Sequence, residues 1–335
     1  MHTHGLRITI GIAAFALASS SASLAATAVR SNGFSHLNGP QSGMTSMRTD
    51  ARTAKQLLYI GDNANSKVYV YKLKGKTTPK QIATITSGLN GPQGLTTDLS
   101  GNLYVTNLYG NTVTMYKPGS LVPSLTLSNS IQEPTDVKVD GFGNIYVSNS
   151  PGFGAAGYIL EFPAGSTAPS FIWYTPQINT TISGITLLNP TQQGEVSVYA
   201  AAYTINGSGY ASGSVLSCYP GNGACATVSN SFGQTGGITV AQSPGNQSFQ
   251  WLVTDLYVPG VDTYTNQQRS GQLVTGGTPQ FIALNANKTD LFVSDSFENR
   301  VTEYAWPSGT VVNHIDFGGG AAIYGVAVSP AGTYF

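Results

Sequence analysis

Acidic and amide side chains recur at one position of a repeated sequence pattern, where they could bind a metal ion. Each ends a short apolar run, and the residues are Asp62, Asn107, Asn149, Asp255 and Asp295. If these runs are neighbouring strands that end at one face, their oxygens could form a ring around a hard cation such as Ca²⁺. The alternative is that each side chain folds onto the backbone of the next turn. Repetition favours this structural role, because a single site needs a few unlike residues. We therefore predict no metal ligands and no cofactor, with Ca²⁺ at the axial mouth as the alternative.

Residues that break the repeat at the same face are better candidates for binding. Most of the segments that precede the apolar runs begin with glycine, at Gly94, Gly184, Gly237 and Gly325. One begins with an acid instead, and polar or aromatic residues adjoin this position in three others. Binding residues tend to gather where a rigid scaffold is free to vary. We predict a ligand-binding site at the axial mouth, formed by Gln93, Asp136, Gln280 and Tyr324.

We predict no catalytic residues. Of the four histidines, only His314 lies in the repeated region, in an expected outer strand far from the centre. The chain contains no His-Glu-x-x-His, Cys-x-x-Cys or Gly-x-Ser-x-Gly pattern. A nucleophilic triad would have to be built on His314, so the sequence leans against an enzyme.

Composition limits the classes of partner. Charged residues make up only 9% of the 335 residues, with 15 basic and 15 acidic side chains, against roughly 25% in an average soluble protein. A nucleic-acid binder needs a basic surplus, and a peripheral membrane protein needs a basic amphipathic segment. Neither is visible. We expect no nucleic-acid partner, no membrane partner once the leader is removed, and a monomer.

The N-terminus predicts export. Residues 1–26 resemble a secretory signal peptide, with an apolar run followed by small residues; the alternative is an uncleaved membrane anchor. Residues 27–56 are polar and lack periodicity, which predicts a disordered leader or linker. We expect a secreted or periplasmic protein.

Cys218 and Cys225 flank a turn-rich segment and could form a disulfide in that compartment, with free buried thiols as the alternative.

The elements that position these residues are short strands in six units over residues 57–335. The apolar runs recur every 40 to 53 residues, centred on Tyr59, Tyr104, Tyr146, Tyr199, Leu252 and Phe292. Each run from the second onward is preceded by another strand, and each is followed by two more, which predicts four-stranded propeller blades. The first unit lacks its preceding strand, and the C-terminus carries a spare one at Gly325–Ser329. We predict an all-β, six-bladed β-propeller in which the C-terminal strand completes the first blade.

The repeats resemble those of the NHL-repeat six-bladed β-propellers. The similarity lies in Gly91-Pro-Gln-Gly-Leu-Thr-Thr-Asp98, Gly143-Asn-Ile-Tyr-Val-Ser-Asn149 and Ser294-Asp-Ser-Phe-Glu-Asn-Arg-Val301. It is strong in units one, two, three and six, and weaker in units four and five because of insertions around residues 205–214 and 258–269. The resemblance implies the fold and leaves the function open, because this fold hosts binding proteins, lyases and hydrolases.

Two functions follow from these observations. The first is a non-catalytic scaffold that binds a small molecule, a glycan or a protein at the axial mouth. The second resembles gluconolactonase-like or amidating-lyase-like propellers, in which a metal at the mouth activates water. That class would use a glutamate in the channel. The five glutamates here do not begin any inner strand, and the nearest, Glu133, lies three residues before Asp136. The binding scaffold is therefore favoured.

Overall fold

The computed structural model describes residues 56–331, except 76, 153, 189–195, 207–208, 210, 220–222 and 243–248. The predicted signal peptide, nearly all of the predicted leader and part of the insertion in unit four lie outside the described residues. Among the described residues, no helix is long and apolar enough to cross a membrane.

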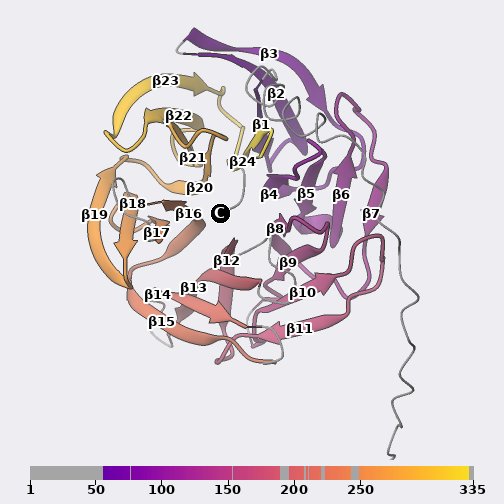
Figure 1. The fold of residues 1–335 in the computed structure, drawn as a ribbon, viewed down its shortest axis with the longest axis vertical. Helices are drawn as coiled ribbons and strands as arrows, with labels where there is room; N and C mark the ends of the chain where they lie inside the picture. The colour runs from indigo at the N-terminus through magenta and orange to yellow at the C-terminus, as the bar shows by residue number, and fades with distance from the viewer. Residues whose placement is uncertain are drawn as a thin grey trace, which may run out of the picture. The chain divides into compact units, whose positions relative to one another are not determined.

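The described strands form six four-stranded antiparallel sheets arranged as blades around a central axis (Figure 1). Blade 1 contains β24 (Ile323–Ser329), β1 (Leu57–Asp62), β2 (Lys67–Lys74) and β3 (Thr77–Ile85). Blade 2 contains β4 (Pro92–Thr97), β5 (Leu103–Asn107), β6 (Thr112–Tyr116) and β7 (Leu125–Leu127), with a short 3-10 turn, η1 (Leu108–Gly110). Blade 3 contains β8 (Pro134–Val139), β9 (Ile145–Asn149), β10 (Tyr158–Phe162) and β11 (Phe171–Tyr174).

The other three blades follow in chain order. Blade 4 contains β12 (Thr180–Leu188), β13 (Ser197–Ile205), β14 (Ala211–Cys218) and β15 (Ala226–Phe232). Blade 5 contains β16 (Thr235–Gln242), β17 (Phe249–Asp255), β18 (Gly260–Thr265) and β19 (Gln268–Val274). Blade 6 contains β20 (Pro279–Leu284), β21 (Asp290–Asp295), β22 (Arg300–Ala305) and β23 (Thr310–Asp316). The predicted all-β, six-bladed propeller is confirmed.

The C-terminal strand closes the ring as predicted. β24 is the inner strand of blade 1 and pairs antiparallel with β1, with Leu58 opposite Val328 and Ile60 opposite Val326. These four side chains are buried in one apolar cluster together with Phe281 and Phe292 of blade 6. The first and last blades therefore share a core, and the sheet that the N-terminal part of the chain leaves incomplete has no open inner edge.

The inner strands approach one another most closely at the recurring glycines. A Cβ atom added to Gly94 would lie 2.5 Å from the Cα atom of Asp136 in the next blade, and one added to Gly184 would lie 2.9 Å from the Cα atom of Gly237. Neither space can hold a methyl group. Glycine is therefore required at these positions because the backbones of neighbouring blades are in contact there.

Each inner strand also breaks its register with the second strand near this ring. Such bulges leave backbone groups without a ladder partner. In blades 2, 3 and 6, the residue before the recurring Asp or Asn supplies the missing partner through its hydroxyl. Thr106, Ser148 and Ser294 accept hydrogen bonds from the N–H groups of Gly94, Asp136 and Phe281, at 2.8, 2.9 and 2.9 Å respectively. The Ser or Thr of the repeat is thus a structural residue.

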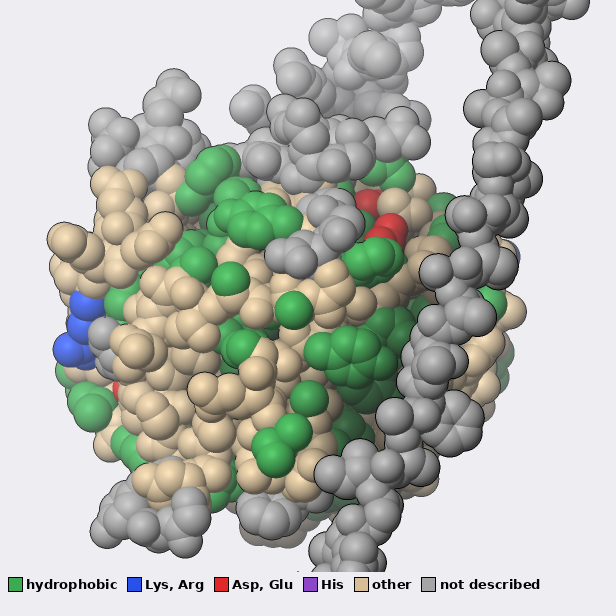
Figure 2. Space-filling view, turned by 90° about the horizontal axis from the view of Figure 1, so that it is seen from below, with side chains coloured by type: hydrophobic (Ala, Val, Ile, Leu, Met, Phe, Trp, Pro, Cys, Tyr) green, Lys and Arg blue, Asp and Glu red, His purple; other side chains and the backbone are tan. Residues whose placement is uncertain are grey.

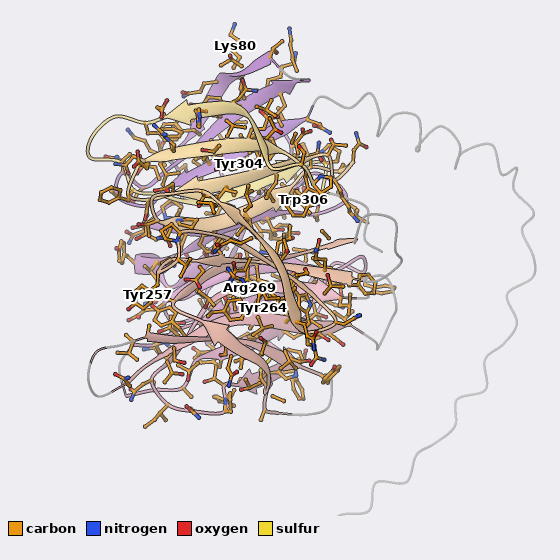
Figure 3. All side chains as sticks on the ribbon, turned by 90° about the vertical axis from the view of Figure 1, so that its left-hand side faces the viewer. Lys80, Tyr257, Tyr264, Arg269, Tyr304 and Trp306 are labelled. Carbon is orange, nitrogen blue, oxygen red and sulfur yellow. A yellow bond between two sulfur atoms is a disulfide. The ribbon has the colours of Figure 1, made fainter. Side chains whose placement is uncertain are left out.

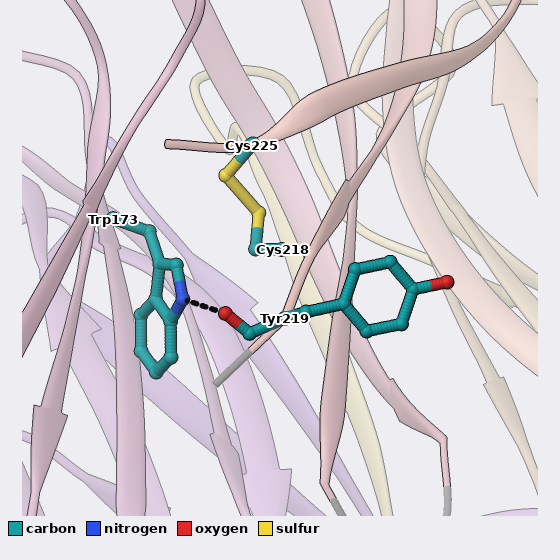
Figure 4. The surroundings of a disulfide bond; sticks show 4 residues. All are labelled: Trp173, Cys218, Tyr219 and Cys225. Carbon is teal, nitrogen blue, oxygen red and sulfur yellow. Dashed lines mark hydrogen bonds between the residues drawn. A yellow bond between two sulfur atoms is a disulfide. The ribbon is translucent and has the colours of Figure 1, made fainter. Parts of the chain in front are cut away.

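A disulfide joins Cys218 to Cys225, as predicted. The loop that it closes contacts the outer strand of blade 3: the indole N–H of Trp173 donates to the carbonyl of Tyr219 at 2.8 Å (Figure 4). The N–H of Cys225 also donates to the carbonyl of Tyr174 at 2.9 Å. The disulfide therefore stabilises a contact between two blades as well as the end of one blade.

Deletion of residues 323–335 tests the closure. The truncated chain loses β24, which exposes the edge of β1 and the apolar surface around Leu58. We expect insoluble protein, or protein without a single cooperative thermal transition, in circular dichroism and light scattering. Deletion of residues 332–335 alone keeps β24 and is the control. A 323–335 deletion that melts like the full chain would contradict the ring closure.

Replacement of both cysteines by alanine tests the disulfide. The loop is short, so chain entropy predicts a loss of about 2 kcal/mol in the free energy of unfolding, measured in urea. Unreduced wild-type protein should be two hydrogens lighter than reduced protein in intact-mass spectrometry. Two cysteines that react with iodoacetamide in the native oxidised protein would show that the bond is absent.

Candidate functional site

The recurring Asp and Asn residues hold the turns of their own blades together. Asp295 accepts hydrogen bonds from the N–H of Thr278, at 2.9 Å, and from those of Phe297 and Glu298, at 2.9 and 2.8 Å. It thereby joins the loop that enters the inner strand to the turn that leaves the second strand. Asp255 makes the equivalent bonds to Gly233, Tyr257 and Val258.

The other members of this set act in the same way. Asn107 and Asn149 accept hydrogen bonds from the N–H groups of Asn90 and Gln132, at 3.1 and 3.0 Å. Asp62 accepts one from Ala322 at 3.1 Å. Within the part of the chain that the structure describes, no three His, Cys, Asp or Glu residues are grouped so that they could hold a metal ion. These contacts favour the structural role of the recurring Asp and Asn residues over a cation ring.

Asp136 is buried in the wall between blades 3 and 4 and is only 1% exposed. Its carboxylate accepts hydrogen bonds from the ammonium group of Lys138, at 2.7 and 2.8 Å, and from the N–H of Ile185 in blade 4 at 2.9 Å. Burial raises the pKa of this carboxyl, and the charge of Lys138 is the main opposing influence. Asp136 therefore links blades 3 and 4 at the position that glycine occupies in four other blades, and its carboxylate is buried there.

The other three predicted residues lie at the starts of inner strands. Gln93 and Gln280 are half-buried, and the amide of Gln280 donates to the hydroxyl of Ser296 at 2.9 Å. The Oε1 atom of Gln93 is buried and has no hydrogen-bond partner. Burial raises the pKa of Tyr324, and the nearby Tyr109 and Tyr203 raise it further. The predicted mouth therefore carries tyrosines and amides beside one another, without the carboxylate of Asp136.

Exposed aromatic residues were not identified from the sequence at this face. Tyr109, Tyr257 and Phe297 each lie two residues after a recurring Asn or Asp and are 65%, 53% and 75% exposed. Figure 3 shows Tyr257 at one end of the ring and Trp306 at the opposite end. The signal that could have revealed these residues is their shared position in the repeat.

A cavity of about 160 Å³ lies on the axis and receives residues from all six inner strands. These residues come from the second half of each strand, beyond the ring of glycines, and the lining continues to Asn285 and Lys288 in the hairpin between β20 and β21. The cavity therefore lies toward the opposite end from Gln93 and Tyr324. One equivalent position of each blade contributes to the lining, through Thr96, Lys138, Thr186, Thr239, Ala283 and Ala327.

The electrostatics of the cavity depend on two lysines. Among its described lining residues, Lys138 and Lys288 carry the only charges. Lys138 is paired with Asp136 in the wall. Burial lowers the pKa of the Lys288 ammonium to about 8. The described lining therefore combines two lysines with threonine hydroxyls and aliphatic side chains.

Lys288 occupies a backbone conformation that favours glycine. Its φ is 56°, and its N–H donates to the carbonyl of Asn285 at 2.9 Å. The equivalent hairpins of blades 2 and 3 have Gly101 and Gly143 at this position, with φ of 80° and 88°. A lysine costs about 1 kcal/mol more than glycine in this region. This departure from the repeat is visible in the sequence, but it lies in a hairpin, and Lys288 is not among the residues predicted from the sequence.

A second hollow, of about 300 Å³, is formed by blades 5 and 6 and includes His314. His314 lies in the outer strand β23, and its Nδ1 atom is 3.1 Å from the hydroxyl of Thr302. Two charged side chains that line this hollow already interact with protein groups. Asp295 accepts hydrogen bonds from backbone N–H groups, and Arg300 pairs with Asp316 at 2.9 Å. We therefore regard the axial cavity as the stronger candidate site.

Known proteins resemble this chain in fold. No protein-family model and no curated protein sequence matches it. A chain of the nidogen/laminin complex is 14% identical, with a TM-score of 0.61 over 83% of this chain and 99% of that chain. A putative 6-phosphogluconolactonase from Bacteroides fragilis NCTC 9343 is also 14% identical, with a TM-score of 0.57 over 82% of this chain and 98% of that chain.

A third structure is more distant. Hydrazine synthase from Kuenenia stuttgartiensis is 14% identical, with a TM-score of 0.51 over 73% of this chain and 75% of that chain. Identities this low establish the propeller fold alone. The comparisons therefore agree with the fold implied by the NHL resemblance and do not single out the NHL-repeat family.

Replacement of Asp136 by alanine should mainly affect stability. It would leave the half-buried Lys138 without its acid and the N–H of Ile185 without an acceptor, at a cost of about 3 kcal/mol in the free energy of unfolding. The control is Asp316→Ala, which removes an exposed acid from Arg300 and should cost less than about 1 kcal/mol. Urea titrations that give the two variants equal stability would contradict the structural role of Asp136.

Proposed function

We propose that this protein is an exported, NHL-like propeller that acts without catalysis and binds a small molecule in its axial cavity. The observation that carries the proposal is the cavity itself, which all six inner strands line. A site of this kind is held in shape by the closed ring, so it is formed before the ligand arrives. This proposal uses contacts in the cavity, toward the opposite end of the axis from Gln93, Asp136, Gln280 and Tyr324, and a site formed by those four residues stays a prediction.

The chemistry of the lining favours binding over hydrolysis. Its described polar groups are hydroxyls, one amide and two ammonium groups, from Thr96, Thr186, Thr239, Asn285, Lys138 and Lys288, among others. General-base hydrolysis needs an acceptor such as a carboxylate or imidazole within reach of the attacking water. The described lining contains neither. It does contain many aliphatic groups, which bind the apolar part of a ligand.

Export is supported by the signal-like N-terminus and by the disulfide between Cys218 and Cys225, because disulfides persist in oxidising compartments. The low surface charge is consistent with an uncharged or singly charged partner; the side of the molecule in Figure 2 shows few charged side chains among the described residues. The nidogen/laminin structure is, by its name, a complex between proteins, so a protein partner remains an alternative outcome of the test.

The lactonase-like alternative is favoured by one observation, the similarity to the putative 6-phosphogluconolactonase. That similarity is below the identity at which activity can be transferred. The metal-dependent lactonase alternative of the sequence analysis predicts a measurable result: protein purified without chelators would contain about one metal ion per chain and would hydrolyse sugar lactones.

Cavity-filling variants test the proposed function. Ala283→Phe and Thr96→Phe place a phenyl ring in the cavity from the inner strands of blades 6 and 2, and Ala168→Phe adds the same ring at an exposed turn of blade 3 as the control. We expect one-ring fragments to bind wild type and Ala168→Phe in saturation-transfer NMR, and binding to fall at least tenfold in either cavity variant with an unchanged thermal transition.

Two outcomes would contradict this proposal. Fragments that bind the filled variants as well as wild type would place the site elsewhere. Bound metal together with lactone turnover would replace the binding function with the enzymatic one.

A further inference from the structure

We infer that the end of the ring opposite the axial cavity binds a neutral glycan chain along an arc of aromatic rings. The aromatic arc consists of Tyr257, Phe297, Tyr324 and Tyr109, which come from blades 5, 6, 1 and 2. These four blades are consecutive around the ring, because β16, β20, β24 and β4 pack against one another in that order (Figure 1). The site is separate from the proposed cavity site, so the inference goes beyond the proposed function and does not depend on it.

The repeat places the aromatic arc at one end of the ring. Tyr109, Tyr257 and Phe297 lie in the turns that leave the second strands, and each is exposed. Tyr324 is the second residue of β24 and is half-buried, with Tyr109 and Tyr203 close enough to raise its pKa. Figure 3 shows Tyr257 at this end of the ring. Neighbouring exposed apolar side chains on a protein surface mark an interaction site.

Two of the rings are held in place before any ligand arrives. A Cβ atom added to Gly91 would overlap the Cδ2 atom of Tyr109, and one added to Gly233 would lie 2.7 Å from the Cδ2 atom of Tyr257. Each tyrosine therefore rests against a glycine in the loop that leads into the inner strand of its own blade. One side of the ring contacts the backbone while much of the side chain stays exposed. Binding to rings that are already positioned costs little conformational entropy.

The inner strands add uncharged polar groups beside the aromatic arc. None of the six residues that directly precede the ring position is charged. They are Gln93, Thr135, Ser183, Gly236, Gln280 and Tyr324. The recurring acids of blades 5 and 6, Asp255 and Asp295, are buried and accept hydrogen bonds from backbone N–H groups. Glu298, which follows Phe297, lies 4.0 Å from Arg300. The described groups next to the arc are therefore mainly rings, amides and hydroxyls.

This chemistry fits a neutral glycan better than a protein. The C–H face of a pyranose packs against an aromatic ring, and its hydroxyls exchange hydrogen bonds with amides. The Oε1 atom of Gln93 has no donor within the protein, and a sugar hydroxyl supplies one once the amide turns toward the ligand. A protein surface would bring charged groups, about a quarter of its residues on average, and burying them without partners costs free energy. An arc that extends over four blades suits a chain of several sugars.

The experiment titrates the protein with four neutral β-1,4-linked hexasaccharides, those of glucose, xylose, mannose and N-acetylglucosamine, in saturation-transfer NMR. Hexagalacturonate is the charged counterpart. A ten-residue proline peptide represents a protein segment, because such segments dock on aromatic grooves. The variants are Tyr257→Ala, Phe297→Ala, the double variant, and Tyr109→Phe, which keeps the ring.

The matched control is Phe142→Ala. Phe142 is also exposed, and its N–H donates to the aspartate two residues earlier at 2.9 Å, as the N–H of Phe297 does. It lies in the hairpin between β8 and β9, at the opposite end of the ring from the aromatic arc. The control therefore removes the same side chain from the same kind of turn without touching the proposed site. Lys80→Met, in the outer strand β3 (Figure 3), is a second control at the rim.

We expect at least one neutral hexasaccharide to bind wild type and both controls with equal affinity. Tyr257→Ala and Phe297→Ala should each weaken binding about fivefold, because each removes one stacking surface. The double variant should lose at least tenfold, with an unchanged thermal transition, and Tyr109→Phe should retain most of the affinity. Hexagalacturonate should bind at least tenfold more weakly than the neutral chain, because its carboxylates lose hydration against rings and amides.

Other results would overturn the inference in distinct ways. Failure of all four neutral hexasaccharides to bind would refute the glycan site, and binding of the proline peptide in their place would replace the glycan with a protein partner. Equal losses in Phe142→Ala and Phe297→Ala would show that the site is not at this end. Full affinity in the double variant would refute the role of the aromatic arc. Hexagalacturonate that binds as tightly as the neutral chains would refute the preference for an uncharged ligand.

Discussion

Contact between the backbones of neighbouring inner strands is the constraint on which this structure depends. At the ring of glycines, the strands approach so closely that no side chain fits between Gly94 and Asp136 or between Gly184 and Gly237. The same stretch carries the register breaks of all six blades. Buried backbone groups there need partners, because an unpaired one costs as much as a lost hydrogen bond.

The repeated hydroxyls meet this need and also join the blades. Thr254 donates to the carbonyl of Gln280 in the next blade at 3.0 Å, and Ser294 donates to that of Tyr324. Blade 4 has Ala201 at this position, and there the hydroxyl of Ser183 shares a hydrogen bond of 3.1 Å with the hydroxyl of Thr235 in blade 5 instead. The ring is therefore held by many small hydrogen bonds as well as by the apolar clusters farther out.

The close contact at the glycines also determines where the axis can hold a ligand. Beyond the ring, the second halves of the inner strands leave the cavity that Lys138 and Lys288 line. Asp136 is the one acid at the ring position, and it satisfies its charge with Lys138 and with the backbone of blade 4. Lys138 thus comes from the wall between two blades, and Lys288 comes from the hairpin after β20. The residues that line the cavity differ between blades, whereas the contacts that hold the ring together are shared by most of them.

The sequence alone determined the fold. Strands of period two, glycine turns and a spare C-terminal strand are local patterns that can be recognised in the sequence. Because these patterns repeat, a closed ring is the arrangement that avoids open sheet edges. It also supported the turn-holding role of Asp295 and its equivalents and the pairing of Cys218 with Cys225. It could not determine the end of the axis at which space remains. That depends on distances between backbones of different blades, and Asp136, unusual in the repeat, proved to be buried there. Lys288 lies in a hairpin, outside the strands that the repeat reveals, and only the tertiary structure brings it to the cavity.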